Sequence, residues 1–343
     1  MNPPRSRLIA VLLTFIMTLG FSWPVHATDF VLRLHTWVSP QSADFRHTLL
    51  PWIKRVENAS EGRIRIDVYP SMSLGGEPSK LFAQVRDGEV DIVWTRPGFT
   101  GKQLERLEAF ELPFILTDPE AVSKAYWEYV QAYAADALDG LHLLALHVGG
   151  PTIIHTRGHP VSTIASMKNL RLSVPTRQAA KLLAALGAKP VMLPDASTLS
   201  ALTERAIDGV LAPWDDAADA GLNEQSMYHT IFGPPALNAT THMLAINPKR
   251  YQSLPSELKK ALTGDGGLQT SAQLGNSYKT RSQHQMATFR SNHLVTVSAE
   301  ETQVFRKAAA SVEAQWVKKV TADGFDGQKL LDGARTLIRQ HTN

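Results

Sequence analysis

Apolar and polar positions in the first part of the chain follow the two periods that mark strands and helices. Residues 30–35 and 64–68 alternate as strands do, and residues 90–94 form a short, nearly all-apolar run. Between these segments, residues 48–59 and 78–86 place apolar side chains at helical spacing and are followed by a glycine. Strands that alternate with helices pair mainly in parallel and are covered on both faces. The pattern therefore predicts a first α/β unit.

A second series of alternating elements follows a long helix and a strand. Residues 119–138 have helical spacing, residues 141–148 predict a buried strand, and Gly149-Gly150-Pro151 then interrupts the pattern. The second series predicts strand 170–174, helix 176–186, strand 190–193, helix 197–205 and strand 207–212. We expect a second α/β unit here, in a domain of its own.

The last part of the chain returns to the first unit and then becomes helical. Residues 241–246 predict a returning strand, followed by helices near 256–262 and 268–290. Two α/β lobes joined by more than one crossing segment leave a cleft at the carboxyl ends of their strands, where small ligands bind. The expected division is a first lobe of residues 28–149 plus about 236–278 and a second lobe of residues 150–235 plus about 279–343.

The first 27 residues have the features of a secretory signal peptide. Arg5 and Arg7 precede an apolar run that ends at Phe21, and Val25-His26-Ala27 offers small residues before a cleavage site after Ala27. The apolar run is shorter than the roughly 20 residues that span a bilayer, so a retained anchor is the less favoured alternative. The chain has no cysteine, which excludes lipid attachment through cysteine, disulfides and thiolate chemistry.

Composition narrows the class of protein. The chain of 343 residues is 43% hydrophobic and 20% charged, which excludes wholesale disorder and a multi-pass membrane protein. Removal of Arg5 and Arg7 with the signal peptide lowers the formal charge from +3 to +1. The net charge is small, so it gives no indication of a nucleic acid partner. Export and a two-lobed α/β architecture together indicate ligand capture.

Short motifs occur along the mature chain in the order and spacing of one known family. In the first lobe they are Val56-Glu57-Asn58-Ala59-Ser60-Glu61-Gly62-Arg63, Tyr69-Pro70, Leu74-Gly75 and Val85-Arg86-Asp87-Gly88-Glu89-Val90-Asp91-Ile92. Later ones are Glu111-Leu112-Pro113-Phe114, Met167-Lys168-Asn169-Leu170-Arg171-Leu172, Leu186-Gly187-Ala188-Lys189-Pro190-Val191, Ala206-Ile207-Asp208-Gly209, Ile246-Asn247, Leu254-Pro255 and Gly324-Phe325-Asp326-Gly327. With these motifs the sequence resembles the solute-binding proteins of tripartite ATP-independent periplasmic (TRAP) transporters.

The resemblance implies a two-lobed periplasmic-binding-protein clamshell with a long helix that braces both lobes. It also implies an organic acid in the cleft and delivery to a small and a large integral-membrane subunit, driven by an ion gradient. We expect a periplasmic monomer with no enzymatic activity, cofactor or metal. The family usually has an arginine two residues before Pro175, where it pairs with the ligand carboxylate, but this chain has Ser173 there. Pro175-Thr176-Arg177 and Pro213-Trp214 resemble a branch of the family with a Pro-Thr-Arg motif.

Arg177 is the first candidate for the missing carboxylate anchor. A buried carboxylate needs a cation or several N–H donors, and arginine has the planar geometry for bidentate pairing. Arg177 falls at the expected first turn of a helix, where free N–H groups also favour an anion. A surface ion pair is the alternative. Arg171 is the second candidate, against a solvated or lobe-bracing role, and Ser173 could donate a hydrogen bond or leave room for a bulkier ligand.

Further candidates follow strands whose carboxyl ends face the expected cleft. Trp37 and Trp214 could cover the apolar body of an acid, although either could instead pack in the core of its lobe. Thr95 could donate a hydrogen bond to the ligand. Arg96 is a further possible anchor, with a loop salt bridge as the alternative.

Glu77 and His155 complete the set of candidate binding residues. Glu77 matches a family position where an acidic residue reaches the ligand or its water network, whereas a role near a helix start is the alternative. His155 falls in the expected crossing segment and could donate to a carboxylate, or it could be a structural hydrogen-bonding residue. Asn238, Thr240, Thr241 and His242 precede or begin the returning strand and could also contribute.

The sequence contains few features that indicate other functions. The chain has no Gly-x-Ser-x-Gly elbow, His-Glu-x-x-His pair, Walker A loop or Gly-x-Gly-x-x-Gly motif, which argues against an exported enzyme. His155 and His159 have helical metal-ligand spacing, but Gly158 and Pro160 disfavour a helix there. Presentation of a ligand to a sensor kinase stays open. Ser173 and the tryptophans favour a hydrophobic or aromatic monocarboxylate over a C4-dicarboxylate or sialic acid.

Overall fold

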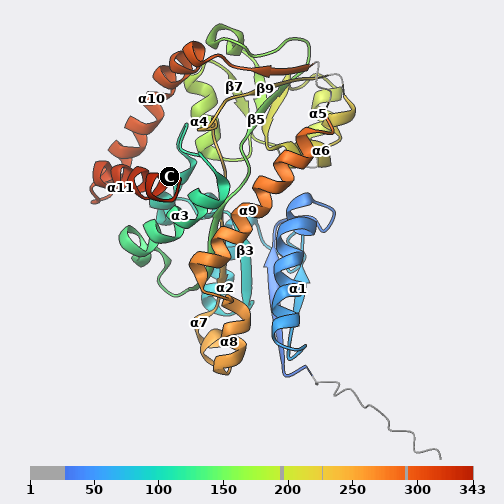
Figure 1. Cartoon of the computed structure of the whole chain (residues 1–343), viewed down its shortest axis with the longest axis vertical. Coiled ribbons are helices and arrows are strands. Elements are labelled where there is room, and N and C mark those ends of the chain that lie inside the picture. Colours follow the sequence, from blue (N-terminus) through green and yellow to red (C-terminus); the bar gives the residue numbers. More distant parts are fainter. Residues whose placement is uncertain (1–27, 194–196, 226, 290–292, 343) are drawn as a thin grey trace, which may run out of the picture.

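Two β-sheets, one in each lobe, organise the chain (Figure 1). The computed structural model describes residues 28–193, 197–225, 227–289 and 293–342. The signal peptide expected at residues 1–27 lies outside the described residues. Within the described ranges, no helix is long and apolar enough to cross a membrane.

The first-lobe sheet has five strands among the described residues, in the spatial order β2, β1, β3, β10 and β4. β1 pairs in parallel with β2 and β3, whereas β10 runs antiparallel to β3 and β4. The strands are β1 Phe30–Thr36, β2 Ile64–Tyr69, β3 Ile92–Thr95, β4 His142–Val148 and β10 Thr241–Ile246. The helices of this lobe are α1 Leu50–Ala59, α2 Leu81–Asp87, α3 Pro119–Tyr133, α7 Pro248–Gln252 and α8 Ser256–Thr263.

The second-lobe sheet has six strands in the part of the chain that the structure describes, in the order β11, β9, β5, β8, β6 and β7. β6 pairs in parallel with β7 and β8, whereas β5 runs antiparallel to β8 and β9. The strands are β5 Ile153–Thr156, β6 Arg171–Ser173, β7 Lys189–Val191, β8 Gly209–Ala212, β9 Tyr228–Ile231 and β11 Leu294–Thr296. The helices are α4 Arg177–Ala185, α5 Thr198–Thr203 and α6 Trp214–Asp219.

Helix α9 (Gly267–Met286) runs from the first lobe to the second and braces both, as expected (Figure 1). It packs on α3 and β4 in the first lobe and on α6 in the second. The N–H of Leu146 in β4 donates to Ser271 Oγ of α9 at 2.9 Å. Gly275 lets α9 approach α3 closely, because a Cβ at this position would overlap the Pro119 carbonyl oxygen and the Ser123 side chain.

The two C-terminal helices, α10 (Ala299–Ala322) and α11 (Gly327–Thr342), also span both lobes. α10 packs on α4 in the second lobe, and α11 packs on α3 in the first. Trp316 is buried in the first-lobe core, and its indole N–H donates to the Glu105 carbonyl at 3.1 Å. The sequence-based division put residues 279–343 in the second lobe. The structure instead joins the end of α10 and all of α11 to the first, because their apolar faces are buried there.

Most of the expected elements are present, with boundaries that shift by a few residues. The sequence analysis missed β5, β9 and β11, and also a run of short 3₁₀ turns over Lys102–Glu111. β5 was expected to be part of a crossing segment, because its four residues follow the Gly149-Gly150-Pro151 break and include His155 and Thr156. In the structure these polar residues are buried with the rest of the strand.

The contact between α9 and α3 generates a stability prediction. Gly275→Ala should lower the free energy of unfolding by about 1–3 kcal/mol, because the new methyl group must displace backbone atoms of α3. Gly233→Ala is the matched control, since no heavy atom lies within 4 Å of a Cβ built there. Thermal or urea unfolding of both variants measures the difference. Equal stabilities would contradict the close approach of the two helices.

Candidate functional site

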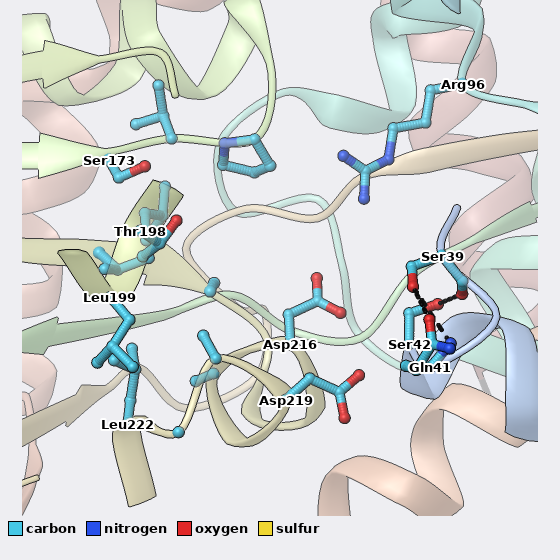
Figure 2. A pocket seen from close by; sticks show the side chains of 18 residues that line it. Ser39, Gln41, Ser42, Arg96, Ser173, Thr198, Leu199, Asp216, Asp219 and Leu222 are labelled. Carbon is cyan, nitrogen blue, oxygen red and sulfur yellow. Dashed lines mark hydrogen bonds between the residues drawn. The ribbon is translucent and has the colours of Figure 1, made fainter. Parts of the chain in front are cut away.

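A cavity of about 490 Å³ opens between the lobes at the carboxyl ends of several strands (Figure 2). The first lobe contributes Ser39, Gln41 and Ser42, which follow β1, and Arg96, which follows β3. The second-lobe wall is largely apolar and comes from the ends of β6 and β8 and from α5 and α6. Its apolar members are Val174, Pro175, Leu199, Val210, Leu211, Ala212, Ala217, Ala220 and Leu222.

Arg96 is the cation of the first-lobe wall. Its side chain extends into the cavity towards the second-lobe wall that contains Ser173 (Figure 2). The residue is only 6% exposed, and its guanidinium carbon lies 5.2 Å from the ring centroid of Trp37. A guanidinium above an indole face is favourable and limits the orientations of the side chain. The cavity therefore combines one positioned cation with an apolar wall.

A second compartment of about 320 Å³ adjoins the first and shares Arg96 and Pro175 with it. Arg177, the first residue of α4, lines this compartment and is exposed. Thr176 caps the helix, because its side chain accepts a hydrogen bond from the Ala179 N–H at 3.1 Å. Glu77 lies at the same compartment and is exposed. Two arginines thus line the joined compartments.

Two buried glutamates form the floor of the second compartment, and the sequence analysis did not single them out. Burial, and to a smaller extent the charge of the neighbouring Glu111, raises the pKa of Glu108 to about 7. Gln178 Nε2 donates to Glu108 Oε2 at 2.6 Å. Burial also raises the pKa of Glu111, which accepts hydrogen bonds from the hydroxyl and the N–H of Thr241 at 2.7 and 3.1 Å. The sequence contains Glu111 in one of the family motifs, but nothing local indicates that it is buried.

Arg281 of α9 joins the two lobes behind the cavity. Its guanidinium pairs with Asp44 of the first lobe at 3.0 Å and with Asp215 of the second at 2.6 Å, and it donates to the Ala43 carbonyl at 2.6 Å. Burial alone would lower the pKa of Arg281, but the two carboxylates outweigh burial and raise it. Burial raises the pKa of Asp215 to about 6 despite the pairing.

A more exposed contact joins the lobes at the cavity. Asp219 of α6 pairs with Arg46 of the first lobe at 2.9 Å and also accepts a hydrogen bond from the Ala43 N–H. Asp219 and its neighbour Asp216 both line the cavity (Figure 2). Carboxylate atoms of Asp44, Asp215 and Asp216 lie within 4.8 Å of one another, a spacing that could suit a metal ion. Because Arg281 already supplies a cation to two of them, we interpret the cluster as an ion bridge between lobes.

Several predicted site residues meet at the joined compartments. Ser173 and Arg96 line the main cavity, whereas Arg177, Glu77 and again Arg96 line the second compartment. Ser173, at the end of β6, is 5% exposed.

Trp37 and Thr95 lie directly behind this wall. Trp37 is partly buried, supports Arg96 and packs on Trp94 at 5.5 Å and on His242 at 5.9 Å between ring centroids. Thr95 is 1% exposed, and its hydroxyl has no hydrogen-bond partner among the described residues. Neither residue is part of the lining of the two compartments described above.

Three candidates lie elsewhere. Trp214, expected at the cleft, is 2% exposed and packs on Phe289 at 4.7 Å and on His155 at 5.3 Å between ring centroids, because the first turn of α6 directs it into the second-lobe core. His155, expected in a crossing segment, is fully buried in β5, and its Nδ1 lies 2.8 Å from Nδ1 of His229. Burial lowers the pKa of His155 to about 3. Arg171, the second anchor candidate, forms a two-point pair with Asp208 at 3.0 and 2.7 Å.

The strand that returns to the first lobe contributes support behind the cavity. His242 is 1% exposed and stacks on His147 at 4.8 Å and on Trp94 at 5.3 Å between ring centroids. Asn238 Nδ2 and the hydroxyl of Thr241 donate to the carbonyl and to Oε1 of Glu111, respectively. These residues hold Glu111 and the aromatic packing behind Arg96 rather than lining the cavity.

Comparison with known proteins agrees with this geometry. Residues 35–319 match the family model of the bacterial extracellular solute-binding proteins, family 7. The chain belongs to the TRAP solute-binding protein family. This finding confirms the resemblance and the two-lobed fold that the sequence implied. Members of this family are periplasmic binding proteins for small organic acids that work with membrane TRAP components.

Solved structures of TRAP solute-binding proteins resemble this chain over about nine-tenths of its length. A protein from Rhodoferax ferrireducens T118, in complex with copurified benzoate, is 39% identical with a TM-score of 0.83, over 91% of this chain and 98% of that one. A marine metagenome protein specific for aromatic acid ligands, in complex with 3-hydroxybenzoate, is 31% identical with a TM-score of 0.85. The match covers 92% of this chain and 100% of that one. A protein from Bordetella bronchiseptica with bound mandelate is 25% identical with a TM-score of 0.78, over 90% and 99%.

The raised pKa of Glu108 predicts a pH-dependent difference between the protein and a Glu108→Gln variant. The folded protein keeps this proton up to about pH 7, whereas the ordinary value is 4.5, so Glu108 lowers stability progressively as the pH rises from about 4.5. Glutamine resembles the protonated form and keeps the contact with Gln178. Relative to the unsubstituted protein, the variant should gain about 2–3 kcal/mol of unfolding free energy between pH 5 and pH 8.

Thermal and denaturant unfolding across this pH range, measured on both proteins, gives the difference. Glu89→Gln is the control, since Glu89 is exposed. A pH-independent difference between the Glu108→Gln variant and the unsubstituted protein would contradict the pKa of Glu108.

The contact between Arg46 and Asp219 predicts an effect on ligand release. Arg46→Gln should raise the dissociation rate of a bound ligand about two- to fivefold, because a partly exposed ion pair between the lobes contributes less than about 1 kcal/mol. Stopped-flow measurement with an acid that binds the protein gives the rate. Arg65→Gln serves as control, because Arg65 pairs with Asp67 within the first lobe. Equal dissociation rates for the two variants would exclude a role of Arg46 in closure.

Proposed function

We propose that this protein is a periplasmic receptor that captures an aromatic monocarboxylate and delivers it to the small and large membrane subunits of a TRAP transporter. The observation that carries the proposal is the pairing of one positioned cation, Arg96, with a largely apolar wall across the same cavity. The signal peptide expected at residues 1–27 supports export. We propose a monomer, without enzymatic activity, as the working form.

The mechanism follows from the chemistry of the two walls. The carboxylate leaves water when it enters the cleft, so it needs a cation, and the guanidinium of Arg96 can pair with it in a bidentate manner. The aromatic ring packs against the side chains of Val174, Val210 and Leu222, and the Ser173 hydroxyl is available to donate a hydrogen bond. A ligand that touches both lobes stabilises the closed form over an open one.

Arg177 and Glu77 have supporting roles in this proposal. Arg177 lines the adjoining compartment and adds positive charge there, whereas Arg96 lines both compartments. The sequence analysis favoured Arg177 as the anchor, and this assignment stays a prediction. We prefer Arg96 because its buried guanidinium is stacked on Trp37, which reduces the entropy that is lost on binding.

The relatives support the aromatic class of ligand. The solved structures with 39% and 31% identity contain benzoate and 3-hydroxybenzoate, respectively. Both cover nearly the whole mature chain of this protein with TM-scores above 0.8. A protein that shares the fold and a third of its residues with such receptors is a reasonable candidate for the same ligand class.

Thermal shift and calorimetry with a panel of aromatic, branched aliphatic, dicarboxylic and sugar acids test the proposal. An aromatic monocarboxylate at 100 times its Kd should stabilise the protein by about 2.7 kcal/mol. Arg96→Ala should weaken its binding by at least about 100-fold, the loss of a charged pair worth roughly 3 kcal/mol. Arg177→Ala should weaken it less.

Two outcomes would contradict this assignment. A larger loss in Arg177→Ala than in Arg96→Ala would move the anchor to the second compartment and leave the ligand class intact. Binding of dicarboxylates or sugar acids, with none of the aromatic acids, would overturn the ligand class itself. Arg171→Ala is the control, because Arg171 pairs with Asp208 outside both compartments.

A further inference from the structure

The second compartment contains a buried acidic group that the proposed function does not use. Glu108 lines this compartment and is only 6% exposed. Gln178 Nε2 donates a hydrogen bond to one of its carboxyl oxygens, Oε2. Among the described residues, the other oxygen, Oε1, has no hydrogen-bond partner. A shielded polar atom without a partner is costly, so a ligand atom that pairs with Oε1 would gain affinity.

The backbone of Gly98 shows where this second oxygen lies. Gly98 belongs to the short turn Pro97–Phe99 and lines the same compartment as Glu108. A Cβ built on Gly98 would lie 3.9 Å from Glu108 Oε1, the one heavy atom found within 4 Å of it among the described residues. Oε1 is therefore at the wall of the compartment, and glycine at position 98 leaves its approach free of side-chain atoms.

The proton of Glu108 makes the group compatible with an acidic ligand. Burial, and to a smaller extent the charge of Glu111, raises the pKa of Glu108 to about 7; Glu105 acts in the same direction, whereas Gln178 and Lys181 oppose it. A protonated carboxyl group does not repel a ligand carboxylate, and it can both donate and accept a hydrogen bond. A hydroxyl group, which also does both, is the best complement to it.

The neighbouring buried groups of the compartment already have partners. Glu111 accepts hydrogen bonds from the hydroxyl and the N–H of Thr241. The Thr176 side chain accepts from the Ala179 N–H, and a hydrogen bond from Thr176 also lowers the pKa of Glu111. Of these three buried groups, Glu108 is the one with an oxygen left for a ligand.

The position of Arg96 determines which part of a ligand reaches Glu108. Arg96 lines both compartments, so a carboxylate bound there lies where they join. The ring of the proposed ligand packs on the apolar wall of the main cavity, which Glu108 does not line. A branch on the carbon that bears the carboxylate is then the part nearest the second compartment. The volume of about 320 Å³ leaves room for a hydroxyl or hydroxymethyl group there.

We propose that Glu108 determines specificity by forming a hydrogen bond with a hydroxyl group on a branch of the ligand, at the carbon that bears the carboxylate. The second compartment is the subsite for this branch, and the preferred ligand is an arylacetic acid with a hydroxyl or hydroxymethyl group at C2. One enantiomer is preferred, because the carboxylate and the ring are already fixed. This inference rests on the proposed function, since it assumes that the carboxylate binds at Arg96.

The test compares ligands that differ at this carbon alone. The probes are phenylacetate and the separate enantiomers of its 2-hydroxy, 2-methyl, 2-hydroxymethyl and 2-ethyl derivatives, with Kd measured by calorimetry on the purified protein. Hydroxyl and methyl groups are similar in size, so each pair isolates the hydrogen bond. In at least one pair, one enantiomer of the hydroxyl-bearing acid should bind at least tenfold more tightly than its methyl counterpart of the same spatial arrangement.

Variants assign this preference to Glu108 and to the second compartment. Glu108→Leu should bring the Kd ratio of the methyl to the hydroxyl acid towards one, whereas Glu108→Gln, which can still donate and accept, should keep part of the preference. Gly98→Val adds side-chain atoms beside Oε1 and should weaken the branched acids at least tenfold more than phenylacetate. Glu89→Leu is the matched control and should keep every ratio, because Glu89 is exposed and lines neither compartment.

Each outcome decides between the two proposals. If phenylacetate binds but the hydroxyl and methyl acids bind equally, Glu108 is not a specificity residue and the proposed function stands. If the preference survives in Glu108→Leu, another residue causes it and the inference is wrong. If no aromatic acid binds, both proposals fail. If Glu108→Leu does not fold, Gly98→Val decides, and equal losses for branched and unbranched acids would overturn the inference.

Discussion

The buried guanidinium of Arg281 is the constraint on which the arrangement of the lobes depends. An arginine that is 9% exposed must have its charge compensated, since an unpaired buried charge costs several kcal/mol. Asp44 of the first lobe and Asp215 of the second supply that compensation. Asp44 follows the Ser39–Ser42 segment, and Asp215 precedes Asp216. The bridge therefore positions both walls of the cavity through the residues next to Asp44 and Asp215.

The contacts between the lobes differ in how easily they can break. Arg281, Asp44 and Asp215 are all less than 10% exposed, so separating them would leave an uncompensated charge in a dry environment. The pair of Arg46 and Asp219 is partly exposed, and water can replace it at little cost. We therefore expect a hinge motion that opens the cavity to break the Arg46 contact and to keep the Arg281 bridge. Ligand contacts on both walls then add to the weak Arg46–Asp219 contact and favour the closed form.

The fold could be predicted from the sequence because apolar periodicity, on which the prediction rests, is a local pattern. Apolar periodicity identified β1, β2, β3 and most helices. The end of a strand pointed to Arg96 and the family resemblance pointed to Ser173, and both residues line the cavity. The same rule failed for Trp214, since a position at a strand end does not determine on which side of the sheet a ring packs. Arg281 lies more than 200 residues from Asp44 along the chain, so no local pattern could reveal their pairing. His155 was misplaced because a four-residue strand with two polar side chains has no strand signature.

This chain has Ser173 at the position where the family usually has an arginine, and this difference changes which lobe attracts the carboxylate. An arginine at position 173 would add a cation to the second-lobe wall, close to its apolar residues. With serine there and Arg96 on the first lobe, our proposal separates the two tasks: one lobe binds the charge and the other binds the ring. Neither lobe alone can bind both parts of such a ligand, because the carboxylate needs Arg96 and the ring needs the apolar wall. Closure then depends on a molecule that carries both groups at a fixed distance, which makes the conformational change itself selective for aromatic acids.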